Sequence, residues 1–276
     1  MSRLCLFSNG LGSGEIRARQ IADFMPNAVL DPSDVSSEDT LVFVKSYCSD
    51  HIAKSVRKVY FDVVDCHGVI PKIRDNTDAG IISIGRSHEI FMRMLFPDRE
   101  IVLIPEHHCN FDRIRRPDRP VKVVGFMGDA FSLNCDICKL SQELAKAGLS
   151  FKYSTFFRNR QDVVDFYKDV DISVSFRSDG FNLIKDPRVL PLLKNPLKVI
   201  NAGSFGIPTV SYPETCYECE IPGLYIPVLS LDDLVHSCKL LAFDVKLYKQ
   251  YSDAIFKVAE EYHIERIAKL YEQLIT

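Results

Sequence analysis

Asp62, Asp65 and His67 stand at the end of a predicted strand in the first half of the chain. Polar side chains at the carboxyl ends of parallel strands face the crevice in which open α/β sheets bind their ligands. A carboxylate or an imidazole at that edge can take a proton from a hydroxyl group, which is general-base chemistry. Asp65 and His67 are therefore our catalytic candidates, Asp65 first, and an ordinary polar loop is the alternative interpretation. His107 and His108 are a second option.

A glycine-rich loop, residues 10–17, follows the first predicted strand and opens a predicted helix. The backbone amides near Gly12 and Gly14 can face a phosphate or a sugar, and Arg17 lies one turn into the helix, where it can reach an anion. The loop is not a dinucleotide-binding fingerprint, because its third glycine comes one residue early. It also lacks the Gly-Lys-Ser/Thr ending of a nucleotide-triphosphate loop. A plain tight turn is the alternative.

Two Cys-x-x-Cys pairs, Cys135/Cys138 and Cys216/Cys219, have the spacing of zinc half-sites. The long gap between the pairs is unlike a compact zinc ribbon, so unligated thiols are the simpler interpretation. No thioredoxin-like pattern surrounds either pair, which argues against redox chemistry.

The composition limits the classes of partner. The chain has 276 residues, 46% of them hydrophobic, and a net charge of -3, so it has no overall attraction to nucleic acid or anionic lipid. No apolar stretch approaches the roughly 20 residues that cross a bilayer, and the apolar run near the N-terminus is too short for a signal peptide. We therefore expect a cytoplasmic protein whose nine cysteines are reduced.

Short apolar runs alternate with amphipathic segments, which is typical of βαβ units and parallel sheets. The predicted strands of the first half are Leu4–Ser8, Leu41–Lys45, Val59–Val63, Gly80–Ile84 and Ile101–Ile104. The predicted helices of the first half are Glu15–Phe24, Ile52–Arg57 and His88–Phe96.

A basic, proline-bearing stretch, residues 113–120, interrupts this pattern and suits an exposed linker. A phosphate-facing patch is the alternative. The pattern then restarts with predicted strands at Val121–Phe126, Phe151–Phe156, Asp171–Phe176, Pro208–Ser211 and Leu224–Pro227. The predicted helices of this half are Cys138–Ala147, Arg160–Lys168, Leu197–Phe205, Leu231–Ala242, Tyr248–Tyr262 and Ile264–Ile275.

The segment Lys198–Val210, KVINAGSFGIPTV, resembles the K-x-x-E-A-x-A-x-G-x-P-x-V signature of the group 1 glycosyltransferases, which have the GT-B fold. Gly206 ends a helix and Pro208 directs the chain into a strand. Further segments resemble that family in its order along the chain: Ile104–Glu106, Asn110–Phe111, Val121–Gly125, Phe166–Val174 and Ser178–Leu183. The resemblance covers most of the chain.

The resemblance implies an α/β protein with two Rossmann-like, doubly wound domains that face each other across a cleft. It places an acceptor-side domain at 1–116, a nucleotide-sugar-binding domain at 117–260, and a C-terminal helix at 261–276 that crosses back to the N-domain.

Two departures from the family concern the donor site. Group 1 enzymes carry two glutamates in this region. In this sequence Asp179 takes the place of the first and Asn201 the place of the second, and an insertion relative to the family separates them. The family's Arg and Lys after the first donor-domain strand, which neutralise the departing diphosphate, are replaced by residues 126–129. We expect Arg177 or Lys198 to supply that charge, with Lys185 and Arg188 as alternatives. Glu214 is expected to contact the ribose or the sugar.

The resemblance therefore implies a glycosyltransferase that moves a sugar from a UDP- or GDP-type donor to a hydroxyl acceptor, with no metal or cofactor required. The acceptor can be a glycan, a lipid-linked group, a protein or a modified DNA base, the last suggested only by Arg158 and Arg160. The alternatives are a nucleotide-sugar-binding protein that has lost catalysis and a sugar-nucleotide epimerase. The expected donor-binding residues are Gly12, Gly14, Arg17, Arg177, Asp179, Lys198, Asn201 and Glu214.

Overall fold

The computed structural model describes residues 2–8, 10, 12–46, 56–128, 133, 135–177 and 190–275. These residues form two compact units. Unit 1 holds the described parts of Met1–His107, Arg188–Asn195 and Ile264–Thr276, and unit 2 those of His108–Pro187 and Pro196–His263. The first division falls at residue 107, where the sequence suggested 116. No helix in the described ranges is long and apolar enough to cross a membrane.

Unit 1 is built on a six-stranded parallel sheet of order β2-β1-β3-β4-β5-β6. Its strands are β1 (Leu4–Ser8), β2 (Ala28–Leu30), β3 (Thr40–Val44), β4 (Lys58–Asp62), β5 (Gly80–Ser83) and β6 (Ile101–Leu103). Every strand predicted from the apolar runs is confirmed to within one residue at each end. The edge strand β2 was not predicted, because its three residues are only half-buried and give no clear pattern.

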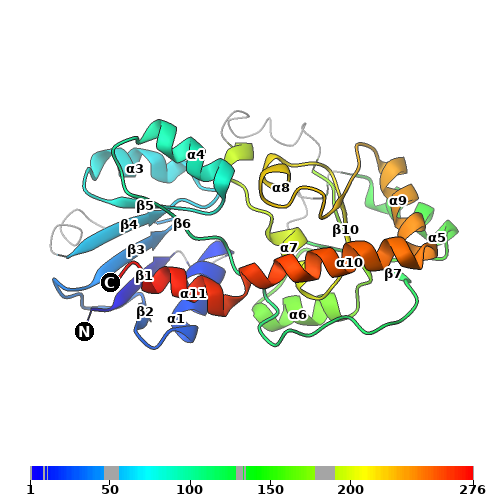
Figure 1. Cartoon of the computed structure of the whole chain (residues 1–276), viewed down its shortest axis with the longest axis horizontal. Helices are drawn as coiled ribbons and strands as arrows, with labels where there is room; N and C mark the ends of the chain where they lie inside the picture. Colours follow the sequence, from blue (N-terminus) through cyan, green and yellow to red (C-terminus); the bar gives the residue numbers. More distant parts are fainter. Residues whose placement is uncertain are drawn as a thin grey trace. The chain divides into compact units, whose positions relative to one another are not determined.

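The helices of unit 1 cover both faces of this sheet (Figure 1). They are the π-helix η1 (Glu15–Arg19), α1 (Gln20–Phe24), the 3-10 turns η2 (His67–Val69) and η5 (Leu190–Leu193), α3 (Ile70–Asp75), α4 (Arg86–Leu95) and α11 (Ile264–Glu272). On one face, Ile73 and Met92 pack with Phe43 and Phe61 of the sheet, and Leu193 of η5 joins the same cluster. The predicted helix at Ile52–Arg57 lies mostly outside the described residues.

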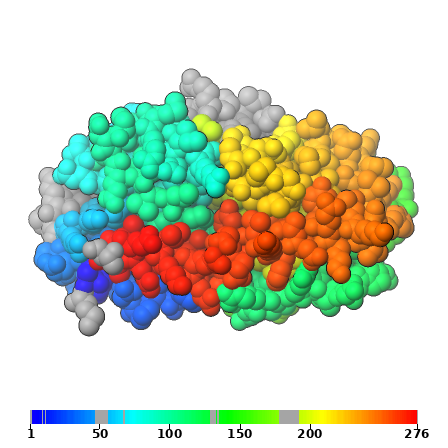
Figure 2. All heavy atoms as spheres, in the orientation of Figure 1, coloured from blue at the N-terminus to red at the C-terminus, as the bar shows by residue number. Residues whose placement is uncertain are grey.

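The helix α11 returns to unit 1 after the whole of unit 2. It contacts α1, and the Thr40 hydroxyl at the start of β3 donates a hydrogen bond of 3.3 Å to the Leu274 carbonyl. In the space-filling view its surface lies among segments from the first hundred residues (Figure 2). The expectation that the last helix packs on the N-domain is confirmed.

Unit 2 is built on a second parallel sheet, of order β11-β10-β9-β7-β8. Its strands are β7 (Val123–Met127), β8 (Ser150–Ser154), β9 (Ile172–Ser175), β10 (Thr209–Ser211) and β11 (Ile226–Pro227). Its helices are α5 (Ile137–Lys146), α6 (Arg160–Lys168), α7 (Leu197–Ser204), α8 (Thr215–Glu220), α9 (Leu231–Phe243), α10 (Val245–Ala259) and the 3-10 turn η6 (Glu260–Tyr262). Most of these bounds lie within two residues of the predicted ones, but α10 begins three residues earlier than predicted and α8 was not predicted.

The two faces of this second sheet have separate cores because side chains alternate along each strand. Val124 and Phe126 of β7 pack with residues of α5 and α9. Met127, the residue after Phe126, packs on the other face with residues of α6 and α7. Helices therefore cover both faces, as a doubly wound sheet requires.

The basic stretch at residues 113–120 is bound into unit 2 and is not the linker that the sequence suggested. Arg116 and Arg119 both donate to Asp171, at 2.8 and 2.9 Å, and Arg113 and Arg115 pair with Glu260 and Asp253. The Asp171 carboxylate also accepts the amides of residues 122 and 123. These contacts outweigh burial and hold the pKa of Asp171 below its usual range. These arginines thus have carboxylate partners in the same unit, and the phosphate-facing alternative stays a prediction.

Candidate functional site

The carboxyl ends of β7, β9 and β10 meet at one edge of the second sheet, because these neighbouring strands are parallel. Gly128 follows β7 there with a φ of +151°, and Lys198 reaches the same place from the first turn of α7. A Cβ on Gly128 would lie 2.9 Å from Lys198 Nζ, so the ammonium group lies directly against the Gly128 backbone. The Nζ atom is shielded from solvent and lies 4.9 Å from the centre of the Phe126 ring. This edge therefore carries a fixed cation.

Arg177 and Glu214 form an ion pair at the ends of β9 and β10. Arg177 Nε donates to Glu214 Oε1 at 2.9 Å, and a second guanidinium nitrogen donates to Oε2. The side chains are only 15% and 7% exposed. Burial alone would lower the pKa of Arg177, but Glu214 raises it, so the guanidinium is charged. Two of the predicted donor-binding residues thus neutralise each other and leave Lys198 as the cation beside Gly128.

Asn201 and Asp179 are the positions that stand for the family's two glutamates. Asn201 lies in α7, and its side-chain oxygen accepts the backbone amide of Cys109 at 2.8 Å. A contact of Asn201 with the donor therefore stays a prediction, because its acceptor atom already has this partner. Asp179, Lys185 and Arg188 lie outside the described residues.

Arg17 in unit 1 is buried. Its Nε lies 2.5 Å from Asp62 Oδ2, its Nη2 donates to the Ile104 carbonyl at 2.9 Å, and the ring of Tyr271 lies 6.0 Å away. Arg17 is 1% exposed and Asp62 is fully buried. The predicted contact of Arg17 with the donor stays a prediction, and the structure gives the side chain partners within unit 1. Of the glycines before it, Gly12 has a φ of +57° and Gly14 is the N-cap residue of the π-helix η1.

Asp65, the first catalytic candidate, pairs with Lys45 where β3 and β4 end. Lys45 and Val64 both have left-handed backbones, with φ of +51° and +45°, and the Lys45 amide donates to the Asp62 carbonyl at 3.1 Å. This conformation costs energy in a residue other than glycine, and most in a β-branched one such as Val64. Strain of this kind gathers at functional sites. The side chain of His67 lies outside the description.

Glu106 is a buried acid at this edge that the search for catalytic groups missed. It follows β6 and is 4% exposed. Asn195 Nδ2 donates to Glu106 Oε2 at 2.6 Å, while Oε1 has no hydrogen-bond partner among the described residues. Burial raises the pKa of Glu106 to about 6, although the charge of Arg17 opposes this. The sequence did carry a signal for Glu106, because it is a charged residue shortly after the last strand of the first sheet.

The remaining candidates have structural surroundings. Cys135 packs against one hydrophobic cluster of unit 2 and Cys216 belongs to another, while Cys138 and Cys219 are exposed. Among the described residues, no group of three or more His, Cys, Asp or Glu side chains is arranged to hold a metal ion.

The two arginines behind the DNA-base alternative also have partners within unit 2. Arg158 pairs with Asp162. Arg160 donates to the Cys109 carbonyl at 2.8 Å.

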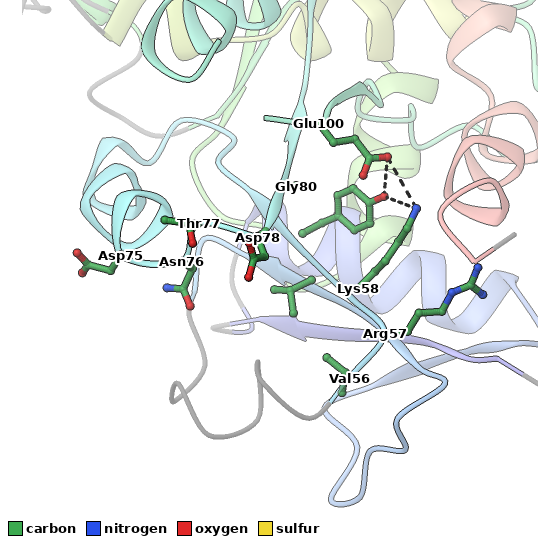
Figure 3. Close-up of a pocket in the computed structure, with 12 residues that line it drawn as sticks. Val56, Arg57, Lys58, Asp75, Asn76, Thr77, Asp78, Gly80 and Glu100 are labelled. Carbon is green, nitrogen blue, oxygen red and sulfur yellow. Dashed lines mark hydrogen bonds and ion pairs between the residues drawn. The ribbon is translucent and has the colours of Figure 1, made fainter. Parts of the chain in front are cut away.

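A cavity of about 500 Å³ opens at the amino ends of β4 and β5, the edge of the first sheet opposite to Glu106 (Figure 3). Lys58 donates to the Tyr60 hydroxyl at 3.3 Å, and that hydroxyl donates to Glu100 at 2.9 Å. The Tyr60 ring covers Gly80, where a Cβ would lie 2.5 Å from ring atoms. None of the predicted site residues lines this cavity.

No protein-family model matches the sequence, and no curated protein sequence matches it. Solved structures do match its fold. WaaG, a glycosyltransferase involved in lipopolysaccharide biosynthesis, matches with a TM-score of 0.61 and 11% identity, over 100% of both chains. Anabaena HepE in complex with UDP-glucose matches with a TM-score of 0.63 and 12% identity, over 99% of both chains.

TarM of S. aureus, in a complex that contains UDP, matches with a TM-score of 0.60 and 14% identity, over 87% of this chain. The chain spans only 56% of TarM, and a similar share of the GtfA/B chain that it matches. At these identities the likeness shows the fold. The two parallel sheets with helices on both faces, the return of α11 to the first unit and the matches over the full chain together give this protein the GT-B fold of the glycosyltransferases that it resembles.

Proposed function

We propose that the protein is a glycosyltransferase that moves a sugar from a UDP- or GDP-type nucleotide sugar to a hydroxyl acceptor. The observation that carries the proposal is the position of Lys198 Nζ against the backbone of Gly128. Group 1 enzymes have their cations directly after the first donor-domain strand, and this chain has Gly128 there. Lys198 supplies, from α7, the charge that the sequence lacks at that place.

Each donor-site residue then has a distinct role. The Lys198 ammonium, fixed before the substrate arrives, stabilises negative charge as the diphosphate leaves, and such preorganised charge is usually the largest contribution to catalysis. Arg177 is oriented by Glu214, so that its remaining N–H groups donate in a fixed direction. The carboxylate oxygens of Glu214 accept from ribose or sugar hydroxyl groups. The UDP and UDP-glucose in the TarM and HepE structures support this class of donor.

Replacing Lys198 by methionine tests the proposal, because methionine keeps most of the apolar stem over Phe126 and removes the charge. A hydrogen bond to a charged group contributes about 1.5–3 kcal/mol, so we expect UDP to bind roughly 10- to 100-fold more weakly. Lys246→Met, on the exposed start of α10, is the matched control and should bind UDP like the wild type. Calorimetric titration with UDP measures both, and unchanged affinity in the Lys198 variant would rule out this site.

A nucleotide-sugar-binding protein without transferase activity is the second candidate. It is favoured by Asn201, which occupies the place of the family's second glutamate and uses its side-chain oxygen to hold the Cys109 amide. Prolonged incubation with UDP-glucose separates the two functions. A transferase releases glucose slowly to water, whereas a binding protein gives a calorimetric signal with no product.

A further inference from the structure

Each of the two sheets has an edge strand on either side, and three of these four strands are very short. β2 and β6 have three residues each, and β11 has two, one of which is Pro227. Short edge strands and edge prolines are means by which proteins prevent another strand from pairing with a sheet. The fourth edge strand, β8, has five residues and no proline. β8 is therefore a long edge without these protections.

The backbone of β8 turns two of its residues toward the open side of the sheet. At one end the Ser150 amide donates to the carbonyl just before β7, at 2.8 Å, and at the other the Ser154 carbonyl accepts from the amide just after β7, at 3.0 Å. Backbone groups of successive strand residues point to opposite sides, so residues 150, 152 and 154 bond to β7. The amide and carbonyl groups of Phe151 and Tyr153 point away from β7 and have no partner among the described residues.

Lys152, the one charged residue of β8, does not guard the open side. Its Nζ lies 2.8 Å from a carboxylate oxygen of Asp169, the residue after α6, and 5.1 Å from the centre of the Phe166 ring of that helix. The ammonium group is thus held over the face of the sheet that α6 covers. Because Asp169 balances its charge, a second strand beside β8 meets no uncompensated charge from Lys152.

Aromatic side chains gather on β8 and directly after it. The rings of Phe151 and Tyr153 are stacked, with centroids 6.0 Å apart. Phe151 packs against the core of unit 2, while Tyr153 is 55% exposed. Phe156, two residues beyond the strand, is 73% exposed. Aromatic residues are enriched where proteins associate, so the same edge offers both free backbone groups and apolar surface.

We propose that two copies of this chain associate through β8, with their β8 strands antiparallel about a two-fold axis. Such an axis turns the open side of one strand toward the open side of the other, so the same groups serve in both copies. A second copy therefore supplies what this edge lacks: free backbone groups, exposed aromatic rings and no net charge from the strand. The two sheets of unit 2 become one continuous sheet.

The charges of β8 select the register of this pairing. If Lys152 lay opposite Lys152 of the second copy, two like charges would face each other, which is destabilising. With Tyr153 opposite Tyr153 of the second copy, Lys152 lies opposite Ser154. This register still uses the outward amide and carbonyl groups of Phe151 and Tyr153.

The oligomeric state tests the proposal. One strand and a few rings form a small interface, and small interfaces are typical of weak, transient association. Sedimentation equilibrium of the wild type between about 1 and about 300 µM should therefore give a mass that rises from one chain toward two. A reductant should be present, because Cys138 and Cys219 are exposed.

Two variants of one residue separate edge pairing from other modes of association. Tyr153→Pro removes an outward N–H and keeps the bonds to β7, since proline is tolerated where the N–H of an edge strand faces solvent. We expect this variant to stay monomeric. Tyr153→Lys keeps the backbone groups and should raise the dissociation constant about tenfold or more, because it opposes two like charges and removes a central aromatic ring. Ile90→Lys, on the exposed side of α4 in unit 1, is the matched control and should associate like the wild type.

Amide hydrogen exchange, followed by NMR, identifies the surface residue by residue. The amides of Phe151 and Tyr153 should exchange more slowly as the protein concentration rises, whereas the amide of Lys152, already bonded to β7, should keep its rate. A wild type that stays monomeric throughout the concentration range would overturn the proposal, as would a dimer that Tyr153→Pro leaves intact. Slow exchange of both outward amides in the monomer would show that the chain itself covers this edge, and would also overturn it. These experiments need no UDP, so they test the interface separately from the transferase function.

Discussion

Replacing Glu106 by glutamine should make the protein more stable at neutral pH. The pKa of this carboxyl rises from an ordinary 4.5 to about 6 because it is buried, so the folded state holds the proton more tightly than the unfolded state. The stabilising effect of the proton is complete below pH 4.5 and is lost as the pH rises through 6. A change of one pH unit in pKa corresponds to about 1.4 kcal/mol, which gives about 2 kcal/mol in total.

Urea unfolding of the wild type and of Glu106→Gln at several pH values between 4 and 8 measures this effect. Glutamine does not titrate, so the free energy of unfolding of the wild type should fall relative to the variant by about 2 kcal/mol across this range. Each unfolding transition should be fitted separately, because two units need not unfold together. Parallel pH profiles for the two proteins would refute the raised pKa of this buried carboxyl.

Two further substitutions test other parts of unit 2. Asp171→Ala leaves the buried Arg116 and the partly exposed Arg119 without their carboxylate. We expect the free energy of unfolding, measured by urea titration, to fall by about 3–5 kcal/mol. A loss below about 1 kcal/mol would contradict the role of the ion cluster. Gly128→Ala places a methyl group 2.9 Å from Lys198 Nζ at a φ of +151°, so UDP affinity, measured by calorimetry, should fall and the free energy of unfolding should drop by about 1–3 kcal/mol. Wild-type affinity in this variant would show that the lysine does not need its place against the backbone.

The sequence predicted most of the fold because the strands of parallel sheets are continuous apolar runs, which are visible without any tertiary information. β4 and β9 are examples, since all but one residue of the two is buried. The helix α3 was missed because its six residues carry Pro71 and lack a full amphipathic period. The basic stretch was misread because the acids that neutralise it come from far along the chain, Asp171 and Glu260 among them.

The candidate site was predictable where one segment carried the signal. Lys198 was identified from a continuous signature, and its helix has the predicted bounds to within one residue. Two pairings were not predictable, because their residues lie far apart in the sequence. Arg177 and Glu214 are 37 positions apart, and Glu106 and Asn195 are 89 positions apart. Local patterns give the type of a side chain and its element, but the partner that sets its charge state depends on which strand ends become neighbours.

The return of α11 to unit 1 also has a consequence for how the chain folds during synthesis. Tyr271 lies beside the buried pair of Arg17 and Asp62, and the Leu274 carbonyl accepts from Thr40 at the start of β3. The first sheet leaves the ribosome early, yet this covering helix is made only after all of unit 2. A nascent chain must therefore keep the pair of Arg17 and Asp62 without its contact to α11 while the second unit is translated, so the domain that begins first is completed last.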